Sequence, residues 1–186
     1  MVGTPMMRLM KGAISIGTAT EMIFDFRNLE ERRAGLALNR LFPLAYDYWC
    51  RLAADRLAQR ADIDPTAIPA VLPNIMLLDV LPGGRDFRYR LAGSNVERNF
   101  GSSAKGIILS DIVKAFPSFQ PIIEVKQRCV ATASPYACDE AIFTHFGTLK
   151  RVYCFAMPLS DDGVTVSHIF AVGILEPVED AAPQPG

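Results

Sequence analysis

The sequence contains few of the residues from which metal and redox sites are built. Its 186 residues include two histidines and four cysteines, and the cysteines form no C-x-x-C pair. Because zinc sites and dithiol redox sites need such close spacings, we expect neither zinc nor a redox motif. Isolated cysteines are usually buried, where they behave as small hydrophobic side chains. Unpaired cysteines are also typical of proteins in a reducing compartment.

A strong net charge and long apolar runs are also lacking. The formal net charge of −1 gives no general attraction to nucleic acid or to an anionic membrane. No segment approaches the ~20 consecutive apolar residues that cross a bilayer. Gly12, Gly17 and Glu21 interrupt the apolar stretch near the N-terminus, which leaves a poor signal peptide. We therefore expect a cytoplasmic protein with no membrane span and no nucleic-acid partner.

The motifs of common enzyme classes do not occur either. The chain has no G-x-S-x-G, no H-E-x-x-H and no phosphate-binding glycine-rich loop. Asp139 and Glu140 are adjacent in a predicted strand, so their side chains point to opposite faces and cannot act together on one substrate. We therefore do not expect an enzyme, and a small α+β enzyme with an acid–base pocket is the weakest functional hypothesis.

Alternating apolar and polar residues predict a β-hairpin in the middle of the chain. Phe87, Tyr89 and Leu91 alternate with Arg88 and Arg90, which is the period-2 pattern of a strand with one solvated face. A second apolar run precedes this strand, and a Pro-Gly-Gly turn separates the two. We therefore expect these two strands to pair antiparallel.

Helical periodicity and three late apolar runs complete the expected set of elements. The pair Asp162-Gly163 marks a hairpin turn between the last two strands. The expected helices are 29–41, 44–60, 94–100 and 119–133, and the expected strands are 74–81, 87–92, 136–146, 150–159 and 164–175.

This order of elements does not follow the βαβ alternation of a doubly wound sheet. It predicts an α+β fold: a five-stranded antiparallel sheet with a helical insertion on one face and extra N-terminal helices. The chain then divides into a loose N-terminal extension (1–27), N-terminal helices (28–61), the sheet-containing domain (62–176) and a disordered tail (177–186).

Several short runs in this chain occur together in a known family. They are Tyr48-Trp49, Asp62-Ile63-Asp64-Pro65, Leu72-Pro73, Leu78-Asp79-Val80, Phe87-Arg88-Tyr89-Arg90-Leu91-Ala92-Gly93 and Met157-Pro158-Leu159-Ser160. With them, residues 46–175 resemble the alphaproteobacterial family of single-domain PAS proteins. The resemblance implies the PAS fold and a sensory or signalling role without fixing a ligand. Where that family often has Pro-His before the first strand, this chain has Pro73-Asn74.

A sheet covered by short helices predicts a ligand pocket between them. We expect polar side chains at Tyr89, Tyr153 and His168, and apolar walls at Phe100, Ile122 and Met157. The alternative is that these residues fill an ordinary core. The cofactor is unknown. Flavin photochemistry is not expected, because residues 93–100 lack the cysteine that such a domain carries in this helix.

The N-terminal helices suggest how the chain is assembled. Tyr48 and Trp49 either pack the second helix onto its own domain or contact a second copy of the chain, and we expect a homodimer. The leading hypothesis is a cytoplasmic sensory module that binds a small molecule or a signalling protein partner. The second is a structural interaction module with a filled core and no ligand.

Overall fold

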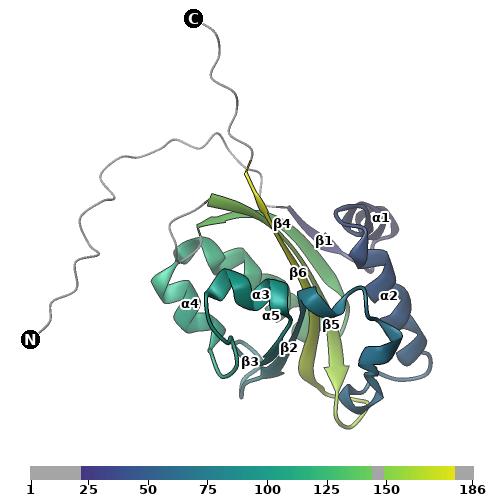
Figure 1. The fold of residues 1–186 in the computed structure, drawn as a ribbon. Helices are drawn as coiled ribbons and strands as arrows, with labels where there is room; N and C mark the ends of the chain where they lie inside the picture. The colour runs from purple at the N-terminus through teal and green to yellow at the C-terminus, as the bar shows by residue number, and fades with distance from the viewer. Residues whose placement is uncertain (1–21, 144–148, 179–186) are drawn as a thin grey trace, which may run out of the picture.

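A computed structural model describes residues 22–143 and 149–178. In this part of the chain, six strands form a single antiparallel sheet with the order β1-β4-β5-β6-β2-β3 (Figure 1). The strands are β1 (Met22–Asp25), β2 (Ile75–Val80), β3 (Phe87–Ala92), β4 (Tyr136–Phe143), β5 (Leu149–Ser160) and β6 (Val166–Pro177).

The two predicted hairpins are confirmed. Strands β2 and β3 pair antiparallel, and the Leu81 N–H donates to the Asp86 carbonyl at 2.9 Å across their turn. Gly83 and Gly84 there have positive φ angles, which glycine adopts without steric cost. Strands β5 and β6 are joined through Gly163, which also has a positive φ.

Helices lie on both sides of the sheet. Two precede the hairpin, α1 (Leu29–Ala37) and α2 (Leu41–Leu52), and three follow it, α3 (Ser94–Phe100), α4 (Leu109–Ala115) and α5 (Gln120–Thr132). Short 3₁₀ turns connect these elements at Arg60–Asp62, Pro65–Ala67, Leu72–Asn74 and Pro117–Phe119. The element order and the antiparallel sheet are those of the PAS fold, as predicted.

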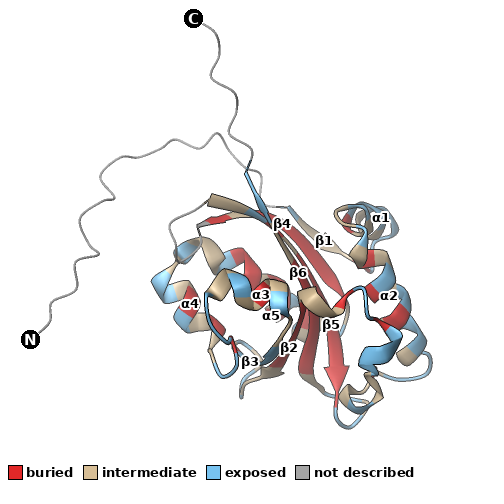
Figure 2. Ribbon diagram, viewed as in Figure 1, coloured by how far each residue is buried: buried red, intermediate tan, exposed pale blue. Residues whose placement is uncertain are grey.

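Because both sides are covered, the sheet has two hydrophobic cores. One lies between the sheet and α3, α4 and α5, and includes Leu78, Phe87 and Ile169. The other lies under α1 and α2, and includes Phe42 and Phe155. Figure 2 shows the central strands buried along most of their length. The sequence of a strand that is buried on both faces is a nearly continuous apolar run. Most of β5 is such a run.

Strand β1 was not predicted. Its residues fall in the predicted loose extension, but they pair with β4 and make the sheet six-stranded instead of five-stranded. Phe26, just after β1, stacks on Phe155 with 4.7 Å between the ring centroids. This aromatic contact ties the strand to the second core. The rest of that extension, before residue 22, and the predicted tail beyond residue 178 lie outside the described residues.

Helix α2 is shorter than its sequence suggests. It ends at Leu52, whereas the periodicity predicts a helix to residue 60. The following segment instead pairs with the end of β5, where the Ser160 N–H donates to the Ala58 carbonyl at 2.9 Å. Tertiary pairing with the sheet therefore overrides the local helical preference.

Candidate ligand cavity

An apolar cavity of about 140 Å³ lies between the sheet and α3, α4 and α5. The walls consist mainly of hydrophobic side chains. The other residues that line the cavity are Tyr89, Asn99, Cys154 and Gly173. The residues of the walls come from five strands (β2 to β6), from the three helices and from the segments around them. The lining residues are Met76, Tyr89, Val96, Asn99, Phe100, Ile107, Ile112, Phe116, Phe119, Ile122, Ile142, Val152, Cys154, Gly173 and Leu175.

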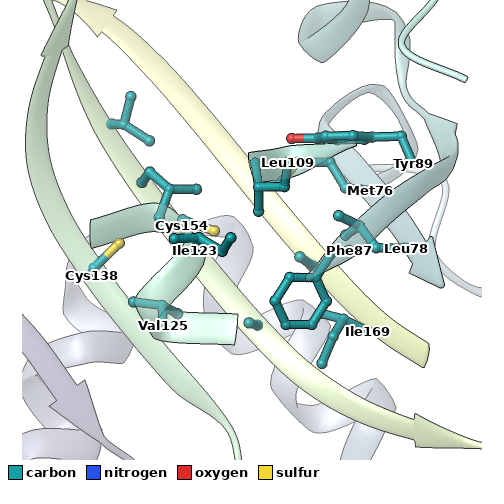
Figure 3. Close-up of a cluster of buried hydrophobic side chains, with 14 of the residues drawn as sticks. Met76, Leu78, Phe87, Tyr89, Leu109, Ile123, Val125, Cys138, Cys154 and Ile169 are labelled. Atoms are coloured by element: carbon teal, nitrogen blue, oxygen red, sulfur yellow. The ribbon is translucent and has the colours of Figure 1, made fainter. Parts of the chain in front are cut away.

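Three predicted site residues meet in this cavity. Tyr89, Phe100 and Ile122 all line it. The rings of Tyr89 and Phe100 meet edge to face with 5.6 Å between their centroids. Such packing fixes both rings and leaves the Tyr89 hydroxyl directed toward the interior, as Figure 3 shows.

The other three predicted residues do not line the cavity. Tyr153 and Met157 belong to β5, but they pack into the core on the opposite side of the sheet. His168 does not face the cavity either: its Nδ1 lies 3.1 Å from Asp79 and its Nε2 lies 2.8 Å from Asp161. The prediction that these three contact a ligand there is wrong, because successive strand residues alternate between faces.

Among the described residues, two strand side chains with polar atoms line the cavity, Tyr89 of β3 and Cys154 of β5. Tyr89 is 4% exposed, and its hydroxyl makes no hydrogen bond to any described residue. Burial raises the pKa of this phenol, so the group is neutral and retains its proton as a hydrogen-bond donor. A hydroxyl in the wall of a cavity can donate a hydrogen bond to a polar atom of a ligand or to a water molecule.

A buried lysine and two cysteines form one edge of the same region. Lys126 of α5 is completely buried, and its Nζ donates to the Ile122 carbonyl at 3.2 Å and to Cys154 Sγ at 3.4 Å. Cys138 lies directly across from Cys154 in the pairing of β4 with β5, and both are labelled in Figure 3. The hydrogen bond from Cys138 and the positive charge of Lys126 lower the pKa of Cys154 to about 6 despite its burial. The sulfur of Cys154 is thus positioned to act as a counterion for the Lys126 side chain.

A polar recess adjoins the cavity. It has a volume of about 290 Å³ and shares Asn99, Gly173 and Leu175 with the cavity. A side chain on Gly173 would meet Met76 Cε at 2.7 Å, so glycine keeps this shared wall open. The remaining residues of the recess are Asn74, Asn95, Arg98, Lys150 and Ile174.

The predicted interface residues lie on α2. Tyr48 is buried within the chain's own second core, and its hydroxyl accepts from the Asp64 N–H at 2.7 Å. The prediction that Tyr48 contacts a second copy is therefore wrong. Trp49 is half-buried, and its indole N–H donates to the Pro158 carbonyl at 2.9 Å. Its role at an interface stays a prediction.

A family model described as a PAS domain matches residues 40–175, which is most of the chain. The chain belongs to the PAS domain family. No curated protein matches it. Among solved structures, this PAS domain is similar to an RNA-binding light-oxygen-voltage receptor, with 16% identity and a TM-score of 0.44 over 63% of this chain and 35% of that one. It is also similar to a light-oxygen-voltage domain studied with a flavin analogue, with 14% identity and a TM-score of 0.44 over 63% of this chain and 86% of that one. The chain thus spans about a third of the length of the first of these.

The described part of this PAS domain has neither a helix able to span a membrane nor a cluster of metal-binding side chains. Within residues 22–143 and 149–178, no helix is long and apolar enough to cross a bilayer. The same residues hold no group of three or more histidine, cysteine or acidic side chains able to bind a metal ion.

Sequence reasoning missed the polar parts of the site. The burial of Lys126 could have been inferred from the sequence. Lys126 lies four residues after Ile122, so both residues are on the same apolar face of α5. Asn99 and Lys150 carried no signal. They meet only in three dimensions, where the Lys150 ammonium donates to Asn99 Oδ1 at 2.8 Å.

Proposed function

We propose that this PAS domain is a cytoplasmic sensory module that binds a small, mainly apolar molecule between the sheet and α3, α4 and α5. It passes the signal to a second copy of the chain or to another protein and does not catalyse a reaction. The observation that carries the proposal is the open, mainly apolar volume of about 140 Å³ with the Tyr89 side chain in its wall.

The size and walls of the cavity support a ligand in preference to a filled core. Protein interiors are close-packed, and an apolar space of about 150 Å³ is large enough to hold benzene. Tyr89 then supplies one hydrogen bond to a polar atom of the ligand, while the other walls exclude water. Asn99 lines both the cavity and the recess, and Lys150 of the recess donates to it at 2.8 Å.

Filling the cavity from one wall is expected to abolish binding. Val152 of β5 is 4% exposed and lines the cavity, so the larger side chain in Val152→Phe occupies the space that a ligand needs. With fluorobenzene as the probe, fluorine NMR should detect binding to the wild type and an affinity lower by at least about tenfold in the variant. This corresponds to losing roughly 1.4 kcal/mol of binding free energy.

The control is Val164→Phe, which makes the same chemical change at a residue that is 81% exposed in the turn after β5. It should leave fluorobenzene binding unchanged. A wild-type protein that binds no fluorobenzene would contradict the sensor proposal and favour the interaction module with a closed core.

We further propose that the module acts as a homodimer through α1 and α2, with Trp49 near the contact. Two leucines support this proposal: Leu29 of α1 is 51% exposed and Leu44 of α2 is 50% exposed. These two exposed leucines and the half-buried Trp49 lie on the same pair of helices and offer apolar surface that a second copy would cover. The same helices contact β4, β5 and β6, so the interface connects to the sheet that forms the cavity wall.

Introducing a charge on α2 is expected to break the dimer. In light scattering, the wild type should have twice the chain mass of 20.4 kDa, and Leu44→Glu should shift the average mass toward the single-chain value. Leu91→Glu is the control, because Leu91 is 46% exposed on the distant edge strand β3. A monomeric wild type, or equal masses for both variants, would refute the α1–α2 interface.

A further inference from the structure

Among the residues that the structure describes, the lining of the polar recess beside the cavity includes two positive charges and no negative one. Lys150 and Arg98 line it together with three asparagines. Within the described residues, neither cation has an acidic side chain within 4.0 Å, which is the distance of an ion pair. Their partners are neutral amides: Lys150 donates to Asn99 at 2.8 Å, and Arg98 Nη1 donates to Asn95 Oδ1 at 3.2 Å.

The acidic residue of α3 is held elsewhere. Glu97 lies next to Arg98 in the sequence, but its Oε1 accepts from Ser103 Oγ at 2.8 Å and from the Ala104 N–H at 3.2 Å. The carboxylates that form ion pairs with Arg88, Arg90 and Arg151 belong to Asp79 and Asp139. None of these acids lines the recess. Counted over the described residues, the recess therefore has a net positive charge.

The side chains in the recess suit a carboxylate. Lys150 is half-buried, and its ammonium group donates one hydrogen bond to Asn99 Oδ1. Its two other N–H groups can donate to a ligand. Arg98 is exposed at the rim, where its guanidinium can meet the same group. A charge-assisted hydrogen bond to a half-buried lysine is stronger than one between neutral groups.

We propose that the ligand of this PAS domain is a small monocarboxylic acid. Its apolar body, about the size of a benzene ring, lies in the cavity, and its carboxylate binds Lys150 in the recess. The inference rests on the proposed function, because it assigns a chemical class to the ligand of that cavity. A monoanion fits better than a phosphate ester, because Lys150 is the one half-buried cation among the described residues of the recess.

The test compares an acid with its neutral analogue. The probes are 3-phenylpropanoate and 3-phenylpropan-1-ol, which share the ring and the chain, measured by calorimetry at neutral pH. The wild type should bind the acid about tenfold more tightly than the alcohol. Lys150→Met should remove this preference and leave the affinity for the alcohol unchanged, and Lys150→Arg should retain it.

Two controls separate the charge of Lys150 from other effects. Lys105→Met removes an equal charge from an exposed loop and should leave the preference intact. Acetate and inorganic phosphate lack the apolar body and should bind neither the wild type nor the variants. Unchanged circular dichroism of Lys150→Met verifies that the variant is folded.

Each result has a separate meaning. If the acid and the alcohol bind the wild type equally, or if Lys150→Met retains the preference, the carboxylate site is refuted while the cavity proposal stands. Phosphate binding that depends on Lys150 would refute the monocarboxylate and assign the recess to phosphate. If neither phenyl compound binds and fluorobenzene does not bind either, the proposed function fails as well.

Discussion

Replacing Cys154 with alanine is expected to lower the free energy of unfolding by about 3–5 kcal/mol, which is far more than the loss of one sulfur atom explains. Lys126 Nζ has two acceptors among the described residues, the Ile122 carbonyl and Cys154 Sγ. Removing the thiolate leaves a fully buried ammonium group with one neutral acceptor. An unpaired buried charge is among the most costly single defects in a protein core.

A double-mutant cycle isolates this interaction. In a Lys126→Met background, Cys154→Ala should cost only about 1 kcal/mol, because only a small cavity is created. Cys129→Ala is the control, since Cys129 is equally buried and makes no hydrogen bond to Lys126 within the described residues. It should cost about 1 kcal/mol in both backgrounds. Urea unfolding measures all of these values, and equal costs of Cys154→Ala in the two backgrounds would rule out the ion pair.

The pH dependence provides a second readout of the same pair. The pKa of Cys154 is about 6 in the folded protein against an ordinary value of 9.0. Since the folded state loses this proton at lower pH, ionisation of Cys154 adds stability as the pH rises from 6 toward 9. That contribution disappears as the pH falls through 6. The wild type should therefore be more stable relative to Cys154→Ser at pH 8 than at pH 6.

The sequence predicts strands well where the sheet has one solvated face. In β3, an edge strand, buried Phe87 and Tyr89 alternate with exposed Arg88 and Arg90. This alternation shows which side chains face the core, and Tyr89 lies in the cavity wall on that face. Strand β1 was missed because four residues at a sheet edge are too few to give a periodic signal.

The predictions failed in the central strands for the opposite physical reason. Helices cover both faces of β5 and β6, so residues of both parities are apolar and alternation carries no information about the face. Tyr153 and Met157 were therefore assigned to the cavity, although Val152 and Cys154 line it. Only the pairing register of the strands, which depends on contacts far apart in the sequence, decides between the two sets.

The polar recess depends on tertiary structure even more. Asn99 lies in the last turn of α3 and Lys150 is the second residue of β5, and 51 positions separate them in the sequence. No local pattern brings an amide and an ammonium group to the same opening. Lys126 is the contrasting case, because a charged residue on the apolar face of α5 is visible from helical periodicity alone.

Gly93→Ala is expected to destabilise the protein by about 3 kcal/mol or more. Gly93 joins β3 to α3, and its N–H donates to the Ile75 carbonyl at 2.8 Å. A Cβ atom there would lie 2.2 Å from the Leu72 carbonyl oxygen and 2.5 Å from the carbonyl group of Pro73. These are backbone atoms, so no side-chain rotation can relieve the clash. The φ angle of Gly93 is −74°, which alanine adopts freely, so the cost comes from the steric clash alone.

The matched control for Gly93→Ala is Gly83→Ala. Gly83 has a φ of +91°, and an added Cβ would meet no atom within 4 Å, so this change introduces backbone strain without a clash and should cost about 1 kcal/mol. In thermal unfolding, a loss of 3 kcal/mol lowers the midpoint of a chain of this length by about 6–12 °C. Because α3 carries Asn99 and Arg98, the displaced helix should also weaken binding of 3-phenylpropanoate, whereas Gly83→Ala should not. Equal midpoints for the two variants would refute the close backbone crossing at Gly93 and its role in positioning α3.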